Sequence, residues 1–239
     1  MNLPPIEGYG FIAEIKDTRE LGSSFFLQGC NFQCPYCINR GVLTRENDLV
    51  DPNFIIKRLQ LRMENLVVLS GGEPFVHDNI MDLCQVLKDC NFKVAVATNG
   101  SFPEKIKEAS EKGLIDHIIM DVKTVLEKSR YEEVVGRKLK DEEFRNILDS
   151  IEYLKNGPWY KPSSEFRTTV CSKFVSRDDL ISIATYLGKE TYYVLQPFTT
   201  HQTLSPDLAN EEYVVPFEVL VEWARELVGI VFSCIVREV

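Results

Sequence analysis

The sequence lacks long apolar runs and has only three histidines among its 239 residues. No stretch approaches the roughly 20 consecutive apolar residues that a transmembrane helix requires. The N-terminal residues also lack the basic segment and following apolar segment of a secretory signal. We therefore expect a cytoplasmic protein with no membrane partner.

Positive charge is also scarce. Lysine and arginine together number 27, against 36 aspartate and glutamate residues, and the net charge is −9 at pH 7. A large non-specific nucleic-acid surface depends on clustered basic side chains that neutralise phosphates. The acidic balance therefore argues against nucleic acid as a partner, although it leaves room for a small basic patch around a site.

Cysteine is present in an odd number, which excludes a complete set of disulfide bonds within one chain. In a reducing compartment, seven cysteines are expected to be thiols, metal ligands or catalytic groups. Four of them are scattered and form no compact motif, so we interpret them as small buried hydrophobic residues. These four are Cys84, Cys90, Cys171 and Cys234.

Short apolar runs alternate with longer amphipathic ones along most of the chain. Such alternation predicts an α/β fold, in which parallel strands are joined by crossover helices. With 239 residues and 44% hydrophobic composition, the chain can bury one sizeable core. The predicted strands cover residues 23–28, 65–70, 92–98, 115–122, 165–170, 191–196 and 229–236.

The amphipathic runs predict the helices. Residues 78–89 show the pattern clearly, with four apolar residues on one predicted face. Ser176 precedes another run and has Asp179 three residues later, a pattern that caps helix N-termini. The segments 123–140 and 197–210 are predicted loops, and long loops are often functional. The predicted helices cover residues 52–63, 78–89, 103–112, 141–155, 176–187 and 211–227.

One loop concentrates the residues that can carry chemistry. It reads GCNFQCPYC from Gly29 to Cys37, so its thiols follow a CxxxCxxC spacing directly after a predicted strand. Three close thiols can converge on one metal centre, whereas a zinc site normally requires four protein ligands. A four-iron cluster with three thiolate ligands leaves one iron open for a small chelating ligand. A structural zinc site with a distant fourth ligand and ordinary buried thiols are the alternatives.

An aromatic residue, Tyr36, directly precedes the last cysteine, and with it the motif resembles the signature of radical S-adenosylmethionine (SAM) enzymes. The resemblance implies that Cys30, Cys34 and Cys37 hold a 4Fe–4S cluster whose fourth iron is chelated by SAM. It also implies that one electron from the reduced cluster cleaves SAM to a 5′-deoxyadenosyl radical. Tyr36 is expected to lie against the adenine.

The resemblance extends from about Phe25 to Phe198. It implies a partial, open (β/α)6 barrel of the TIM type, in which parallel strands end at the ligand. We expect one radical SAM domain over residues 1–239. Its core is expected at about 23–198, and a C-terminal helix and strand at 211–236.

Two segments at predicted strand ends resemble cofactor-binding motifs of the family. The segment SGGEP is similar to the GGEP motif, in which glycine backbone and a glutamate receive the amino group of the methionine part. The resemblance assigns this role to Gly71, Gly72 and Glu73. An ammonium group beside a carboxylate is stabilised by Coulombic attraction. The segment TNG resembles a second motif, which implies that Thr98 and Asn99 line the same site.

Three charged side chains further along the chain complete the resemblance. In glycyl-radical-activating enzymes the lysine of a DxK pair meets the methionine carboxylate, a role that carries to Lys123. The aspartate of the pair helps to hold a monovalent cation, and the resemblance assigns this role to Asp121. The position of the family's second cation-binding aspartate holds Ala97 in this sequence. Arg167 resembles an arginine that reaches the carboxylate or ribose, and His201 resembles a histidine that contacts the ribose.

The second half of the chain resembles the activating protein of the anaerobic ribonucleoside-triphosphate reductase and its relatives. The runs RTTVCSKFVSRDDL and YYVLQPF carry this resemblance. It implies a partner glycyl radical enzyme, from which the radical removes a glycine Cα hydrogen, and a flavodoxin- or ferredoxin-type electron donor. No catalytic residue is predicted beyond the cluster and cofactor. The alternatives are a radical SAM enzyme acting on a small molecule or nucleotide, and a non-catalytic zinc- or cluster-binding module.

Overall fold

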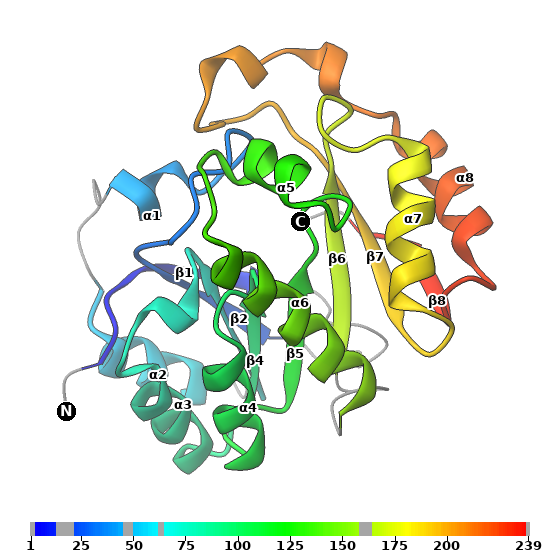
Figure 1. The fold of residues 1–239 in the computed structure, drawn as a ribbon. Helices are drawn as coiled ribbons and strands as arrows, with labels where there is room; N and C mark the ends of the chain where they lie inside the picture. The colour runs from blue at the N-terminus through cyan, green and yellow to red at the C-terminus, as the bar shows by residue number, and fades with distance from the viewer. Residues whose placement is uncertain (1–2, 13–21, 45–49, 62–64, 158–163, 238–239) are drawn as a thin grey trace. The chain divides into compact units, whose positions relative to one another are not determined.

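The computed structural model describes residues 3–12, 22–44, 50–61, 65–157 and 164–237. In these residues eight strands form a sheet whose order follows the chain, from β1 to β8 (Figure 1). The strands are β1 (Ile6–Ile12), β2 (Gly22–Leu27), β3 (Leu66–Gly71), β4 (Lys93–Thr98), β5 (His117–Asp121), β6 (Ser164–Val170), β7 (Tyr192–Pro197) and β8 (Ser233–Val236).

Helices stand between the strands. The α-helices are α1 (Arg40–Thr44), α2 (Pro52–Leu61), α3 (Ile80–Asp89), α4 (Pro103–Glu111), α5 (Lys128–Val135), α6 (Asp141–Asn156), α7 (Arg177–Leu187) and α8 (Phe217–Leu227). Short 3-10 helices are η2 (Pro74–Val76), η3 (Pro206–Leu208) and η4 (Glu211–Tyr213). None of the described helices is both long enough and apolar enough to cross a membrane.

The described chain divides into two compact units. The first unit comprises residues 1–31, 41–98 and 104–118. In it, β1 pairs antiparallel with β2, while β2, β3 and β4 pair in parallel. All four residues of Leu66–Leu69 are buried, as expected for a parallel strand that is covered on both faces. Helix α3 buries the four apolar residues predicted from its spacing, Ile80, Leu83, Cys84 and Leu87.

The second unit comprises residues 32–40, 99–103 and 119–239. Within it, β6, β7 and β8 pair in parallel. Helix α7 begins with the predicted capping box, because the Ser176 hydroxyl accepts a hydrogen bond from the Asp179 N–H and the Asp179 carboxylate accepts one from the Ser176 N–H. Helix α6 buries Ile147, Ile151 and Leu154 on one face. These helices account for the alternating pattern of the sequence.

The predicted α/β fold with an open sheet of parallel strands is confirmed. Several details differ from the prediction. Helix α1 was not predicted, and β8 begins at Ser233 rather than at 229. Strand β1 was not predicted, segment 123–140 contains helix α5, and α8 begins at Phe217 rather than at 211 because Pro216 stands at its N-cap. The extension of a single domain over 1–239 stays a prediction.

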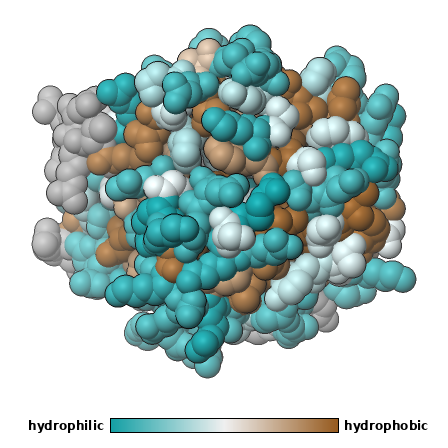
Figure 2. Space-filling view, turned by 45° about the horizontal axis from the view of Figure 1, so that its top comes forward, coloured by the Kyte–Doolittle hydropathy of each residue, from teal (hydrophilic) through white to brown (hydrophobic). Residues whose placement is uncertain are grey.

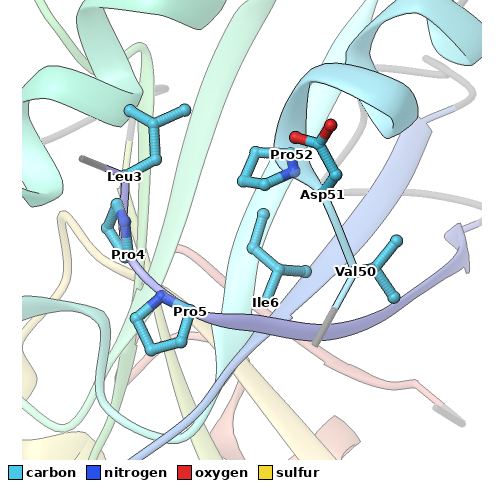
Figure 3. A pocket seen from close by; sticks show the side chains of 7 residues that line it. All are labelled: Leu3, Pro4, Pro5, Ile6, Val50, Asp51 and Pro52. Atoms are coloured by element: carbon cyan, nitrogen blue, oxygen red, sulfur yellow. The ribbon is translucent and has the colours of Figure 1, made fainter. Parts of the chain in front are cut away.

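Hydrophilic side chains cover much of the surface face shown in Figure 2, and hydrophobic residues lie among them in separate patches. A shallow depression in the first unit is lined by proline and aliphatic side chains together with one carboxylate (Figure 3). Its lining residues are Leu3, Pro4, Pro5, Ile6, Val50, Asp51 and Pro52. None of the predicted site residues lies in this list, so the depression is not a candidate for the reaction site.

Candidate functional site

The cysteine loop, defined as residues 29–37, follows β2 directly. Its three cysteines are thiols that form no disulfide, and Cys34 is buried whereas Cys30 and Cys37 are partly exposed. Cys30 belongs to the first unit, and Cys34 and Cys37 belong to the second. The structure therefore describes the surroundings of Cys34 and Cys37 within one unit, and those of Cys30 in the other.

Helix α5 supports the cysteine loop from one side. The Gln33 N–H donates to the Val135 carbonyl at 2.9 Å, at the last residue of the helix. The next residue, Gly136, has a left-handed backbone with φ of 72°, and a Cβ atom there would lie only 2.2 Å from the Gln33 carbonyl oxygen. Only glycine allows the chain to approach the cysteine loop this closely.

The long loop after β7 supports the cysteine loop through its backbone. The Leu204 N–H donates to the Cys37 carbonyl at 3.0 Å, and the Ser205 N–H donates to the Pro35 carbonyl at 2.9 Å. Within the loop itself, the Cys37 N–H donates to the Cys34 carbonyl at 2.9 Å, which closes a tight turn. Backbone hydrogen bonds from two distant segments therefore fix the path of residues 33–37.

The three cysteines are the ligand type that an iron–sulfur cluster requires, but in the part of the chain that the structure describes they are not gathered around one point. Burial raises the pKa of the Cys37 thiol, and the backbone N–H of Asn39 partly offsets that effect. A thiol must lose its proton to bind iron, so metal binding would release protons here. Among the described residues, no three His, Cys, Asp or Glu side chains are gathered around one point as metal ligands would be. Three thiols on one braced loop nevertheless match the donor set of a cluster.

The glycine turn after β3 packs tightly against the end of β2 in the first unit. The Gly72 N–H donates to the Leu27 carbonyl at 2.8 Å, and the Glu73 N–H donates to the Gly29 carbonyl at 2.9 Å. A Cβ atom on Gly72 would lie 1.9 Å from the Gly29 carbonyl oxygen, so no larger residue fits there. The predicted requirement for glycine therefore has a local structural cause, the contact between this turn and the start of the cysteine loop.

Glu73 is buried, with 1% of its surface exposed. Its Oε1 atom accepts hydrogen bonds from the Thr98 hydroxyl at 2.8 Å and from the Phe75 N–H at 3.1 Å. The second contact caps the short helix η2. The structure thus joins two predicted site residues, Glu73 and Thr98, directly. Asn99 is buried next to Thr98, and its Oδ1 accepts from the Ser101 N–H at 3.0 Å, which shapes the turn after β4.

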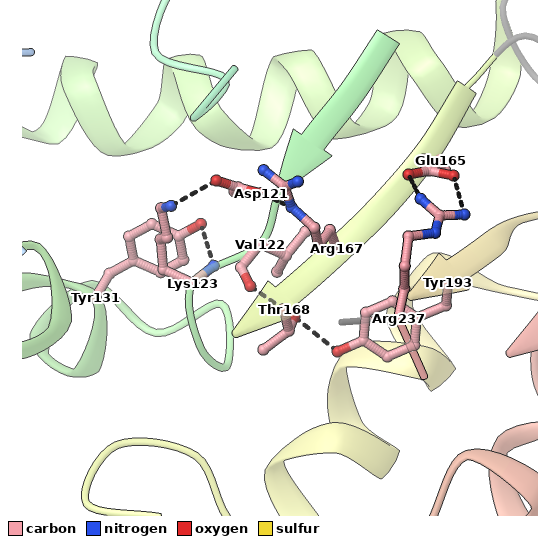
Figure 4. Close-up of polar contacts among 9 residues, drawn as sticks. All are labelled: Asp121, Val122, Lys123, Tyr131, Glu165, Arg167, Thr168, Tyr193 and Arg237. Atoms are coloured by element: carbon pink, nitrogen blue, oxygen red, sulfur yellow. Dashed lines mark hydrogen bonds and ion pairs between the residues drawn. The ribbon is translucent and has the colours of Figure 1, made fainter. Parts of the chain in front are cut away.

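Three predicted charged residues of the second unit form one connected cluster, with Asp121 at the end of β5, Lys123 just after it and Arg167 in the middle of β6 (Figure 4). Arg167 Nε donates to Asp121 Oδ1 at 2.6 Å, and Lys123 Nζ donates to Asp121 Oδ2 at 2.7 Å. Their side chains are 19%, 13% and 21% exposed for Arg167, Lys123 and Asp121, respectively. Two cations therefore share one carboxylate in a largely buried place, which leaves one net positive charge.

The opposite charges of this cluster stabilise the ionised form of each residue, which burial alone would disfavour. Burial alone would raise the pKa of Asp121, but Arg167 and then Lys123 outweigh it and lower that pKa to about 2. Burial alone would lower the pKa of Lys123, but Asp121 more than compensates, so that this pKa lies well above its usual value. All three residues therefore remain ionised at neutral pH, and the cluster can attract an anionic group.

Two tyrosines adjoin the cluster. The Tyr131 hydroxyl accepts a hydrogen bond from the Lys123 backbone N–H at 3.1 Å. Tyr36, in the cysteine loop, is 6% exposed and packs its ring against Phe174 with the centroids 5.9 Å apart. Its buried hydroxyl has no hydrogen-bond partner among the described residues. A buried polar atom without a partner is costly in a folded chain, which favours a ligand group that reaches Tyr36.

A second buried ion pair was not predicted. Glu165 on β6 is 2% exposed, and Arg237 after β8 donates to both of its oxygens, at 2.6 and 3.2 Å (Figure 4). Glu165 stands two residues before Arg167 and therefore on the same face of the strand. The sequence signal for this ion pair was a glutamate within a strand, two positions before an arginine. Its partner, Arg237, lies 72 positions further along the chain.

His201 does not join these clusters within the second unit. It is exposed on a turn of the loop between β7 and η3. Its predicted contact with the ribose, like the predicted contact of Tyr36 with the adenine, stays a prediction.

Comparison with known proteins identifies the family. The model of the radical SAM superfamily matches residues 24–160, more than half of the chain. The chain belongs to the radical SAM superfamily. As a radical SAM enzyme, it uses a 4Fe–4S cluster and SAM.

Two curated relatives of this radical SAM enzyme differ in their named activity. A protein of Methanocaldococcus jannaschii, provisionally named a glycyl-radical enzyme activating enzyme, is 30% identical over 195 residues, which cover 81% of this chain and 79% of the relative. The 7-carboxy-7-deazaguanine synthase of Aquifex aeolicus is 30% identical over 139 residues, which cover 51% of this chain and 62% of that enzyme.

A solved structure supports the fold of the radical SAM enzyme. The structure of TYW1 with a lysine-pyruvate adduct bound matches with a TM-score of 0.62 over 86% of this chain and 72% of that chain, at 15% identity. This similarity concerns the fold alone.

Proposed function

We propose that this radical SAM enzyme activates a glycyl radical enzyme by removing a Cα hydrogen atom from a backbone glycine of that partner. The observation that carries the proposal is the match to the named activating enzyme of M. jannaschii, which spans about four fifths of both chains. The two chains are therefore similar in extent as well as in sequence. A flavodoxin- or ferredoxin-type protein is the proposed electron donor, and the anaerobic ribonucleotide reductase is the proposed partner.

We assign the cluster to Cys30, Cys34 and Cys37. When bound, the cluster and SAM supply an electron and a 5′-deoxyadenosyl radical. The chain must hold the cluster on a loop whose backbone is fixed by contacts with the rest of the protein. Three hydrogen bonds perform this task, because they fix the backbone that carries two of the thiols. Gln33 donates to the end of α5, and Pro35 and Cys37 accept from the loop after β7.

We assign the carboxylate of SAM to the positively charged cluster of Lys123 and Arg167. Arg167 uses only its Nε for Asp121, and its terminal nitrogens make no hydrogen bond to any residue that the structure describes. A guanidinium fork with two available N–H groups matches a carboxylate in a bidentate contact. The net positive charge of the cluster adds Coulombic attraction that is little screened because the side chains are largely buried.

The ammonium of SAM is assigned to Glu73. This carboxylate is buried and already accepts two hydrogen bonds through Oε1, so its position is fixed before the ligand arrives. A fixed acceptor loses little conformational entropy on binding. Gly71, Gly72 and Asn99 are assigned to the walls of the same site.

Anaerobic reconstitution tests the proposal. The chain is loaded with iron and sulfide, reduced with dithionite and given SAM together with a purified candidate partner. We expect 5′-deoxyadenosine and, in the partner, the doublet of a glycyl radical in electron paramagnetic resonance. Release of 5′-deoxyadenosine with no radical in any glycyl radical enzyme encoded in the same genome would overturn the activase proposal.

A small-molecule or nucleotide substrate is the second candidate. It is favoured by the match to the 7-carboxy-7-deazaguanine synthase of A. aeolicus, although that match covers only half of this chain. The same reconstituted enzyme, incubated with purine and pterin compounds, distinguishes the two candidates. Substrate-dependent formation of 5′-deoxyadenosine with a small molecule and not with a protein would favour the second candidate.

A further inference from the structure

Both oxygens of the Asp121 carboxylate are already engaged by cationic side chains in this structure. Each of its oxygens accepts a short hydrogen bond from a cationic donor, Arg167 at 2.6 Å and Lys123 at 2.7 Å. The resemblance to glycyl-radical-activating enzymes predicted instead that Asp121 helps to hold a monovalent cation. The observed contacts therefore conflict with that prediction, and the conflict concerns the chemistry of the donor set.

A monovalent metal ion binds through several oxygen ligands and needs a local excess of negative charge. Asp121 offers one negative charge, which two positive side chains already share. A third cation within reach of both oxygens would be repelled by Lys123 and Arg167 in a largely buried place, where Coulombic forces are little screened. The position that the resemblance gives for a second carboxylate holds Ala97, whose methyl group cannot ligate a metal.

The ammonium of Lys123 also has the properties that such an ion would need. It is tethered to the chain, so its local concentration does not depend on the surrounding salt. Its backbone is held by the hydrogen bond from the Lys123 N–H to the Tyr131 hydroxyl, and Tyr131 is fully buried. A charge held in this way is preorganised and is not lost by dilution.

We propose that the Lys123 ammonium takes the place of a bound monovalent cation beside Asp121, so that this enzyme binds SAM without requiring potassium or sodium. The inference concerns how the cofactor is held. It does not depend on which partner or substrate the radical attacks, and it therefore survives if the activase proposal fails.

The first test measures SAM affinity of the reconstituted wild-type enzyme at constant ionic strength. Potassium chloride and sodium chloride are each compared with tetramethylammonium chloride, whose cation is too large to be coordinated by a carboxylate site. We expect the dissociation constant of SAM to agree within about twofold in the three salts. A weakening of more than about tenfold in tetramethylammonium would overturn the proposal.

The second test uses thermal unfolding of the metal-free chain, which requires neither cluster nor SAM. The wild-type midpoint is expected to be the same in potassium and tetramethylammonium chloride. In Lys123→Ala, one oxygen of a largely buried carboxylate loses its cation, so potassium should bind there and raise the midpoint by about 3 °C or more relative to tetramethylammonium. A potassium-dependent midpoint in the wild type would contradict the proposal even if the variant did not fold.

Lys88→Ala is the matched control. Lys88 donates to Asp116 at 2.7 Å in the first unit, but the Asp116 side chain is 31% exposed and water can replace the lysine. This variant should show no difference between potassium and tetramethylammonium. An equal potassium effect in Lys88→Ala and Lys123→Ala would mean that the effect is a general response to salt, and it would overturn the interpretation of the Lys123 site.

Discussion

The replacement Gly136→Ala tests how the cysteine loop is held. Gly136 has a φ of 72°, which costs an alanine about 1–2 kcal/mol relative to its preferred conformations. The added Cβ would lie 2.2 Å from the Gln33 carbonyl oxygen, so that the loop must move away from α5. This movement breaks the hydrogen bond from the Gln33 N–H to the Val135 carbonyl, which contributes about 1 kcal/mol.

The expected total is a loss of about 2–3 kcal/mol in the free energy of unfolding, measured by urea denaturation of the metal-free chain. The same variant should take up less iron and sulfide on anaerobic reconstitution, because the loop that carries Cys34 and Cys37 is displaced. The two measurements separate a change in stability from a change in the geometry of the loop.

Gly113→Ala is the matched control. Gly113 has a similar φ of 65°, but a Cβ atom there would have no described atom within 4 Å. It should therefore lose only the conformational contribution of about 1–2 kcal/mol and keep full cluster content. If both variants lost the same stability and both kept their iron, the contact between α5 and the cysteine loop would have no role in holding the cluster.

Three further substitutions, the first with a matched control, test the cluster ligands and the contacts around the site. Cys34→Ala should abolish the brown cluster and all SAM cleavage, whereas Cys90→Ala, outside the loop, should keep both; an active Cys34→Ala enzyme would refute the ligand assignment. Glu165→Gln should lower the free energy of unfolding by about 3 kcal/mol in urea titration, because it leaves the partly buried guanidinium of Arg237 without a counter-charge. A loss below about 1 kcal/mol would show that the pair is solvated. Tyr131→Phe should lose about 1–2 kcal/mol, because a backbone N–H loses its acceptor, and should weaken SAM binding in calorimetry; unchanged affinity would mean that Tyr131 does not position the charged cluster.

The sequence predicted most strands because buried parallel strands are continuous apolar runs. The run Leu66–Leu69 and the run Val94–Ala97 are buried throughout, and both could be recognised without knowledge of their neighbours. Helix α3 was equally predictable, because its four buried residues recur at helical spacing.

Helix α5 could not be predicted in the same way. Its sequence, KSRYEEVV, is dominated by polar and charged residues, and only Tyr131, Val134 and Val135 are buried. The helix is stabilised by tertiary contacts of these three residues rather than by a continuous apolar stripe. Strand β1 was missed for a related reason, because IEGYGFI contains two glycines, which weaken a strand pattern.

The residues of the candidate site were predicted by motif, but their contacts were not. Asp121 and Arg167 lie 46 positions apart in the sequence, and no local pattern shows that they form an ion pair. The same holds for the unpartnered hydroxyl of Tyr36, which depends on how the ring packs against Phe174. Local motifs therefore identified the charged groups, and long-range packing determined which charges neutralise each other.

The hydrogen bonds from Leu204 and Ser205 to the cysteine loop have a consequence for biosynthesis. Residues 29–37 are translated well before Leu204 and Ser205, which hold part of their backbone. Until then the thiols of Cys34 and Cys37 are carried by a loop that lacks one of its two supports. A cluster should therefore be held on its full set of backbone contacts only after residues 204 and 205 have been translated and have folded against the loop.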